Sequence, residues 1–183
     1  MKLIAFCILG LFVYGIYKII SDGNKFKDFL KEQKITKCHY YHTNWGDGKY
    51  IIDDQNRDIL WIYKNKGYLG RGYSRITDVE LVIDDSVAYK TSLASSAGRA
   101  VVGGVLVGGV GAIIGGVTGK KNGKKVVHKI ELILSFDTLN NPYAKVTFLD
   151  SKQGEDIFSS KYKEIYDKAL YWSKLIESLM TRN

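Results

Sequence analysis

The sequence predicts an α+β protein: a small antiparallel β-barrel or sheet, capped by a C-terminal amphipathic helix, with a glycine-rich helical insertion and an N-terminal transmembrane helix. Three observations support this prediction. Short segments that alternate apolar and polar residues fill the middle of the chain, an apolar stripe at helical spacing follows them, and two long uncharged runs interrupt the pattern. With 183 residues, of which 45% are hydrophobic, the chain can build one domain with its own core.

The N-terminal segment is predicted to be a membrane anchor. Residues 3–17, LIAFCILGLFVYGIY, carry no charge, and with Lys18 snorkelling the apolar segment extends to Ile20, about the length that a membrane span needs. A cleaved signal peptide is the main alternative, but no small-x-small cleavage site follows the run, and Phe6 precedes Cys7 where a lipoprotein site needs a small residue. Because lysines are more frequent after the span than before it, we expect the rest of the chain on the cytoplasmic side of the inner, cytoplasmic membrane.

The next segment, residues 21–36, is predicted to form an amphipathic linker helix. It is rich in lysine, and Phe26, Phe29 and Leu30 recur at helical spacing. Such a helix would lie close to the membrane surface with its apolar side towards the lipid. A solvated connector between the anchor and the domain is the alternative.

From residue 37 onward the hydrophobic period changes to two, which is typical of strands. About eight short strands with tight turns between them point to an antiparallel sheet or a small barrel. The acidic pairs Asp53 and Asp54, and Asp84 and Asp85, are assigned to turns, where aspartate is favoured for backbone reasons. The predicted strands are CHYYHTNW, KYIID, DILWIY, YLGRGYS, TDVELVIDD, SVAYKT, VVHKIELILSF and YAKVTFLD.

The chain closes with a predicted amphipathic helix that would plug the barrel. Ser159 or Ser160 can cap its start, and most of the charged residues are placed to face water. The apolar stripe consists of Phe158, Tyr162, Ile165, Ala169, Trp172, Ile176 and Leu179.

The most unusual segment is an uncharged run of twenty residues, Ala100 to Gly119, of which eight are glycine. Glycine costs about 1 kcal/mol against alanine in a helix interior. A stripe of small residues, however, lets helices approach closely in a membrane, and small residues at steps of three or four form such a stripe here. The predicted sites of oligomerisation or membrane insertion are Gly104, Gly108, Gly111, Gly115 and Gly119, and the predicted contacts with the membrane surface are Arg99, Lys120, Lys121, Lys124 and Lys125.

The strands on both sides of this run are expected to build one sheet, so they must lie on the same side of the membrane. We therefore favour a helical hairpin, broken near Gly108 and Gly109, that enters the cytoplasmic leaflet or packs on a neighbouring subunit. A hairpin that lies against its own domain, and a full span that splits the domain, are the alternatives. The predicted organisation is an anchor over residues 1–20, a linker helix over 21–36, and a domain over 37–183 with an insertion at 93–123.

The sequence contains no pattern that points to catalysis, a cofactor or a metal, so we expect a protein that is not an enzyme. The glycines do not complete a phosphate-binding loop, and Cys38, His39 and His42 lack metal-ligand spacing. The net charge of +8 comes from dispersed lysines, which favours a membrane-facing protein over one that binds nucleic acid. Trp61 is expected in the core, and Trp45 either packs or anchors at a bilayer surface. A basic hairpin region, which either contacts anionic lipid or is simply solvated, contains Lys64, Lys66, Arg71 and Arg75.

The segments DILWIY, TDVELVIDD, KIELILSF and YWSKLIESL, with a glycine zipper that ends in GGVTGKK, resemble a bacterial pleckstrin-homology-like (PH-like) domain with a glycine-zipper insertion. The likeness covers roughly residues 49–180. It implies a partly open barrel capped by a helix and used as a binding or scaffolding module. The basic loop of phosphoinositide-binding members is not evident between Trp45 and Arg57, so the resemblance does not imply specific phosphoinositide binding.

Two hypotheses of function follow. In the first, the chain is a non-enzymatic, membrane-anchored binding or assembly module whose partners are membrane lipids and further copies of itself. In the second, it is a membrane-perturbing effector whose zipper permeabilises the membrane in a stress response, in phage exclusion or defence, or as a toxin.

Overall fold

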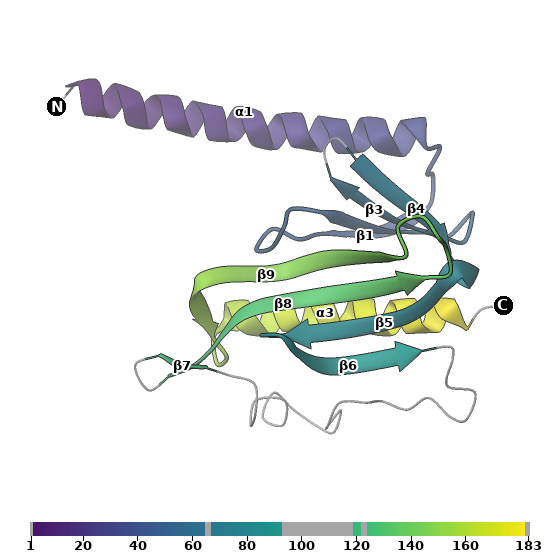
Figure 1. The fold of residues 1–183 in the computed structure, drawn as a ribbon. Helices are drawn as coiled ribbons and strands as arrows, with labels where there is room; N and C mark the ends of the chain where they lie inside the picture. The colour runs from purple at the N-terminus through teal and green to yellow at the C-terminus, as the bar shows by residue number, and fades with distance from the viewer. Residues whose placement is uncertain (1, 65–66, 93–118, 122–123, 182–183) are drawn as a thin grey trace.

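The computed structural model of the chain describes residues 2–64, 67–92, 119–121 and 124–181, and it consists of two antiparallel sheets and two long helices (Figure 1). The predicted α+β fold, with antiparallel strands and a C-terminal helix, is confirmed. The first sheet has the order β1-β2-β3-β4, with β1 at Cys38–His42, β2 at Tyr50–Asp54, β3 at Ile59–Lys64 and β4 at Gly67–Gly72.

The second sheet has five strands and is built around β8 (Lys124–Phe136), which pairs with three other strands. The strand β5 (Ile76–Ile83), which precedes the glycine insertion, lies antiparallel to β8, which follows it. The segments on both sides of the insertion therefore form one sheet, as the sequence predicted. The remaining elements are η1 (Tyr73–Arg75), β6 (Ser86–Ser92) beside β5, and β7 (Gly119–Lys121) and β9 (Tyr143–Asp156), which both pair with β8.

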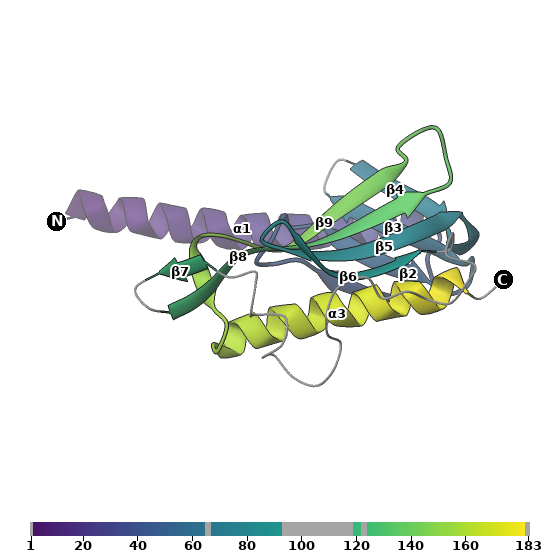
Figure 2. The ribbon, with the colours of Figure 1, turned by 60° about the horizontal axis from the view of Figure 1, so that its bottom comes forward.

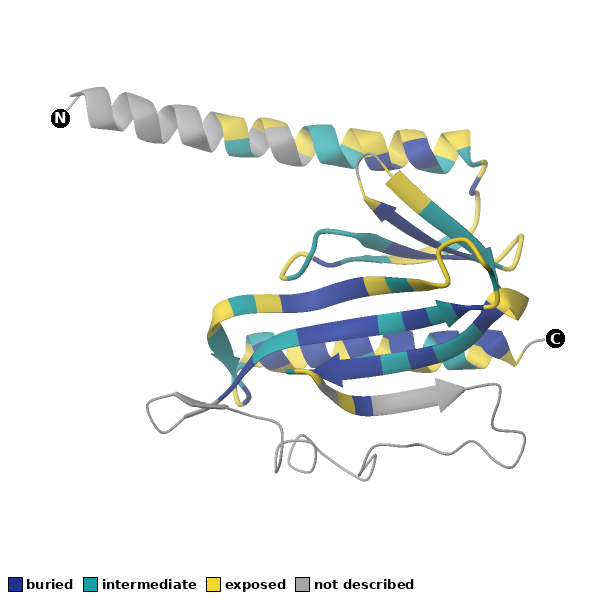
Figure 3. Ribbon diagram, viewed as in Figure 1, coloured by how far each residue is buried: buried dark blue, intermediate teal, exposed yellow. Residues whose placement is uncertain are grey.

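The main core joins the second sheet, one face of the first sheet and the C-terminal helix α3 (Ser160–Met180), as the buried residues in Figure 3 show. Ser159 caps α3 by accepting a hydrogen bond from the backbone N–H of Tyr162 at 3.0 Å. Six members of the predicted stripe, from Tyr162 to Leu179, are buried. Phe158 is the exception: it precedes the helix cap and is 72% exposed, so its assignment to the buried stripe is wrong.

A second, smaller core lies on the other face of the first sheet, under the helix α1 (Lys2–Glu32). Phe26 and Phe29 of α1 are buried against Ile52, Trp61 and Tyr63. The predicted helix therefore exists, but its apolar side packs on the sheet. A solvated connector is therefore contradicted, whereas the closeness of this helix to a membrane surface stays a prediction.

The helix α1 is continuous across the predicted anchor and most of the predicted linker. Within the described part of the chain, we find no helix that combines the length and the apolar character required to cross a membrane. The side chains of residues 2–13, which make up most of the predicted anchor, lie outside the described residues, as do residues 93–118 of the insertion.

Candidate functional site

The predicted site residues fall into two groups. Gly119, Lys120 and Lys121 form β7, and Lys124 and Lys125 begin β8, so these five residues form a short antiparallel hairpin. Gly119 pairs with Val126, and its assignment to the helical insertion is therefore wrong, because it has joined the sheet instead. The residues that lie outside the described part of the chain are Arg99, Gly104, Gly108, Gly111 and Gly115.

The insertion begins and ends at the same sheet. Ser92, where β6 ends, pairs with Asp78, and Gly119, where β7 begins, pairs with Val126. Both partners belong to strands of the five-stranded sheet. A single membrane crossing between Ser92 and Gly119 is incompatible with this sheet, because it would separate strands that pair with one another.

The β7–β8 hairpin and the start of α3 lie at the end of the domain towards which the N-terminal half of α1 points (Figures 1 and 2). At the start of α3, the ammonium group of Lys161 lies 4.1 Å from the centre of the Trp45 ring, a cation–π contact. Trp45 remains 50% exposed in spite of this contact. Trp61, by contrast, is buried in the smaller core, as predicted.

The loop that carries Trp45 is attached to the edge of β9. The backbone N–H of Asp150 donates to the carbonyl of Trp45 at 3.0 Å, and the N–H of Asp47 donates to the carbonyl of Thr147 at 3.1 Å. Between them, Gly46 lies so close to β9 that a Cβ atom there would be 1.6 Å from the Thr147 carbonyl oxygen. Glycine is thus required at position 46 for the loop to reach the strand.

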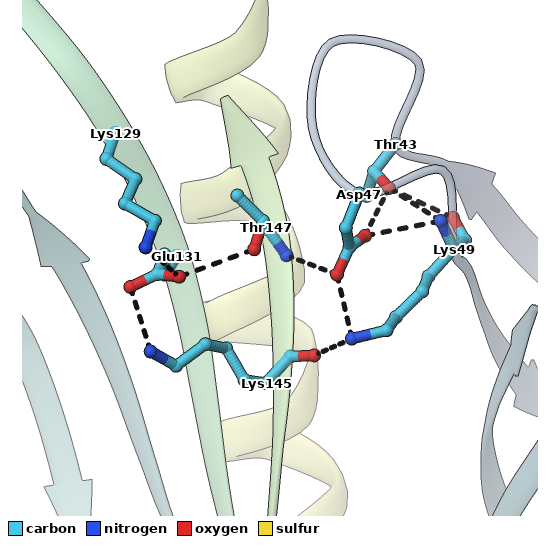
Figure 4. Close-up of polar contacts among 7 residues, drawn as sticks. All are labelled: Thr43, Asp47, Lys49, Lys129, Glu131, Lys145 and Thr147. Atoms are coloured by element: carbon cyan, nitrogen blue, oxygen red, sulfur yellow. Dashed lines mark hydrogen bonds and ion pairs between the residues drawn. The ribbon is translucent and has the colours of Figure 1, made fainter. Parts of the chain in front are cut away.

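Polar side chains continue this attachment across the second sheet (Figure 4). The carboxylate of Asp47 accepts from the N–H of Thr147 and pairs with Lys49, 2.8 Å away. The hydroxyl of Thr147 donates to Glu131, which also pairs with Lys129 at 3.0 Å and Lys145 at 3.2 Å. The network joins the β1–β2 loop of the first sheet to β8 and β9 of the second.

Glu131 is the buried centre of this network. Burial acts to raise the pKa of its carboxyl group, but hydrogen bonds and charges from Lys129 and Lys145 outweigh burial and lower the pKa below its usual value. Hydrogen bonding to Glu131 in turn raises the pKa of Lys129. The group is therefore a stable carboxylate held between two ammonium groups, an arrangement that suits a structural ion-pair network.

A second buried acidic group was not found from the sequence. Asp53 and Asp54 lie in β2 and are almost completely buried, so their assignment to a turn is wrong. Tyr73 donates a hydrogen bond to Asp53, and Arg57 pairs with Asp54 at 2.6 Å. Burial, together with the bond to Asp53, raises the pKa of Tyr73. One sequence signal could have indicated that the pair belongs to a strand: it directly follows the apolar residues Tyr50 to Ile52, with no turn residue between them.

The second predicted acidic turn is correct. Asp84 and Asp85 both have positive φ angles at the β5–β6 turn. One carboxylate oxygen of Asp84 accepts from the backbone N–H groups of His128 at 2.9 Å and Lys129 at 2.8 Å. Asp84 therefore fastens the turn to the neighbouring strand β8.

The predicted basic hairpin borders a groove of about 740 Å³ between β4, η1 and the β8–β9 loop. Arg71 and Arg75 line it from one side, and residues 136–140 line it from the other. Lys64 is exposed on β3, away from the groove lining, and Lys66 lies outside the described residues. Of the described residues of this region, the two arginines line the groove and Lys64 does not.

The histidines near Cys38 take part in aromatic packing. His39 lies 5.2 Å from the ring of Trp172, and His42 stacks on Tyr50 with the ring centres 4.3 Å apart. Across the described ranges, no three histidine, cysteine or acidic side chains gather in a way that could hold a metal ion.

Comparison with known proteins gives a family match over most of the domain. The model of the family described as "Glycine zipper containing PH domain" matches residues 34–150. The chain is similar to the "SPbeta prophage-derived uncharacterized membrane protein YomJ" of Bacillus subtilis (strain 168), with 25% identity over 205 aligned positions that cover 98% of this chain and 85% of that protein. It is equally similar to the "Immunity protein" of Bacillus phage SPbeta, with 25% identity over 98% of this chain and 96% of that protein. No solved structure matches the chain.

Proposed function

We propose that this chain, which belongs to the family of PH domains that contain a glycine zipper, is a non-enzymatic, membrane-anchored module for binding and assembly. The N-terminal half of α1 would cross the cytoplasmic membrane, and both sheets would lie in the cytoplasm. The glycine insertion would associate with further copies of the chain or enter the inner leaflet. Its partners would then be membrane lipids and other copies of itself.

The observation that supports this proposal best is the continuity of α1. The apolar residues 3–20 belong to the same helix as Phe26 and Phe29, which are buried against the first sheet. At a rise of 1.5 Å per residue, Ile20 and Phe26 are separated by about 9 Å along the helix axis. If residues 3–20 cross the bilayer, the domain is therefore held at the membrane surface.

The insertion fits the same arrangement. Because its two ends join one sheet, it must return to the side of the membrane from which it starts. The β7–β8 hairpin that closes it lies at the end of the domain towards which the N-terminal half of α1 points (Figure 1). The lysines of this hairpin, at positions 120, 121, 124 and 125, remain the predicted contacts with anionic headgroups. A similar protein carries the words "membrane protein" in its name, which agrees with the proposal.

Cysteine labelling tests the proposed topology. In a chain with Cys7→Ser and Cys38→Ser, single cysteines replace the exposed residues Gln55 and Lys152, one in each sheet region. We expect an impermeant maleimide to label both sites only after the inner membrane is opened, and the chain to stay in the membrane fraction during carbonate extraction. Release by carbonate, or labelling of either site in intact spheroplasts, would overturn the proposal.

A second candidate function is a membrane-perturbing effector in phage exclusion. The name "Immunity protein" of a similar phage protein favours it, and the glycine insertion would be the perturbing element. Expression in a phage-sensitive host, with plating efficiency and a membrane-potential dye as readouts, tests this function. Unchanged plating and potential would reject the effector role and leave the assembly module as the proposal.

A further inference from the structure

The groove between β4, η1 and the β8–β9 loop combines a fixed positive charge with an apolar floor. The ring of Phe136 is buried in the floor, and the guanidinium of Arg71 lies over it, 5.7 Å from the ring centre. Arg71 also donates to the backbone carbonyls of Gly70 and Asn140, both at 2.9 Å. These contacts fix the guanidinium in place, so little side-chain entropy is left to lose on binding.

Arg71 has unused capacity for an anion. Its two hydrogen bonds to carbonyls use one N–H of Nη1 and one of Nη2, which leaves a second N–H on each of these two atoms for a ligand. Its Nε is buried with no hydrogen-bond partner among the described residues, so it adds an unsatisfied donor but is closed to the ligand. Among the residues that the structure describes, no carboxylate forms an ion pair with Arg71. A partly buried, unpaired charge that is also held in place is costly unless an anion compensates it.

Arg75 supplies a second positive charge at the mouth of the groove. Its one ion pair in the described structure is with Asp137 at 3.6 Å, and both side chains are largely exposed. Exposed pairs of this kind contribute little to stability. A ligand carboxylate can therefore replace Asp137 at little cost. Leu139 lies beside this pair, is fully exposed, and offers an apolar contact.

We propose that the groove binds an acidic segment of a partner protein, with a carboxylate between Arg71 and Arg75 and a neighbouring apolar side chain against Leu139. Arginine is among the residues that are enriched in protein interfaces and in their hot spots. Figures 1 and 2 place the β8–β9 loop at the end of the domain opposite to the one towards which the N-terminal half of α1 points. If α1 is the anchor, as proposed above, the groove faces the cytoplasm and not the lipid.

Arginine side-chain NMR tests this site directly. The full chain, labelled with ¹⁵N-arginine, is placed in phosphatidylcholine nanodiscs and titrated with the peptide Gly-Ser-Glu-Leu-Glu-Ser-Gly. Two further probes are the same peptide with glutamine in place of glutamate, and a short-chain phosphatidylglycerol. The Nε–Hε resonance of Arg57, which is paired with Asp54, serves as the internal control.

We expect the glutamate peptide to shift the resonances of Arg71 and Arg75 and to leave that of Arg57 unchanged. The variant Arg75→Ala should weaken binding about two- to fivefold, as expected for the loss of one exposed ion pair, whereas the charge-matched control Lys152→Ala should bind as the wild type. Equal shifts with the glutamine peptide, unaltered binding by Arg75→Ala, or shifts caused by phosphatidylglycerol alone would overturn the proposal. Since the peptide needs no particular topology, a failure here leaves the cysteine-labelling result unaffected.

Discussion

The ring of Phe29 in α1 stacks on the ring of Tyr63 in β3, with the centres 4.4 Å apart and the planes 22° from parallel. Phe26 stacks in the same way on Tyr50, at 3.9 Å. These two contacts dock the helix on the outer face of the first sheet. They suggest how the connection between helix and domain can be broken without touching the main core.

The variant Phe29→Ala should release α1 from the sheet. Removing a buried phenylalanine typically costs about 3 kcal/mol or more, and here the loss falls on the smaller core. Hydrogen exchange of residues 50–64 should therefore become faster, while that of α3 should not change. Lys27→Ala, an exposed position on the same helix, is the control. Unaltered exchange at residues 50–64 would show that the docking contributes nothing.

The variant Glu131→Gln should reduce both the stability and its dependence on pH. Because the pKa of Glu131 is lowered in the folded protein, its contribution is complete above the usual value of 4.5 and is lost as the pH falls through the lowered pKa. At pH 7 we expect a loss of about 1 kcal/mol in the free energy of unfolding, since Lys129 and Lys145 are partly exposed.

Urea denaturation at neutral pH and below pH 4.5 measures this difference. The wild type should lose stability over this interval, and the gap between wild type and variant should narrow at the acidic end. Glu164→Gln, at an exposed position of α3, is the control. The same pH dependence in the wild type and in Glu131→Gln would contradict the assignment.

The variant Gly46→Ala should detach the β1–β2 loop from β9. The added Cβ would collide with the Thr147 carbonyl, which is backbone and has little room to move. We expect a loss of about 2 kcal/mol in the free energy of unfolding, typical of overpacking. Gly67→Ala is the matched control, because no atom lies within 4 Å of its Cβ position, and it should change the stability by less than about 0.5 kcal/mol. Equal stability of Gly46→Ala and Gly67→Ala would contradict the requirement for glycine at position 46.

The variant Gly108→Leu should abolish self-association in membranes. A leucine in the small-residue stripe would keep two helices from approaching closely. Chemical cross-linking of membranes that contain the wild type should give oligomers, and the variant should give monomers while remaining membrane-bound. Val102→Leu, which the helical spacing places away from the stripe, should cross-link as the wild type. If Gly108→Leu gives as many oligomers as the wild type, the glycine zipper does not mediate self-association.

The elements that follow a regular hydrophobic period could be predicted from the sequence. The period of two gave the strands of both sheets except β7, which lies in the predicted insertion, and the period of three to four gave α3, with Ser159 as its cap. Local signals of this kind act over a few residues, so no knowledge of distant contacts is needed. Phe158 fits the spacing but falls before the cap, where the chain has not yet become helical.

The partners of these elements could not be predicted in the same way. The sequence alone suggests a turn at Asp54, because its partners Arg57 and Trp61 are known only from the structure. The hydrogen bond that Asp53 accepts comes from Tyr73, twenty positions further along the chain. The docking of α1 did leave a signal. Strands β2 and β3 are apolar at consecutive positions, and a strand that is buried on both faces needs a second layer.

The fixed seat of α1 on the first sheet also limits how the domain can explore its surroundings. A domain on a flexible linker samples a volume that grows with the length of the linker. This domain is instead attached to a continuous helix, which packs on the first sheet through Phe26 and Phe29. Any rotation or tilt of α1 therefore also rotates the two sheets. The orientation of the N-terminal half of α1 therefore determines the orientation of each face of the domain. A partner that binds one face has to approach from the side towards which that face is turned.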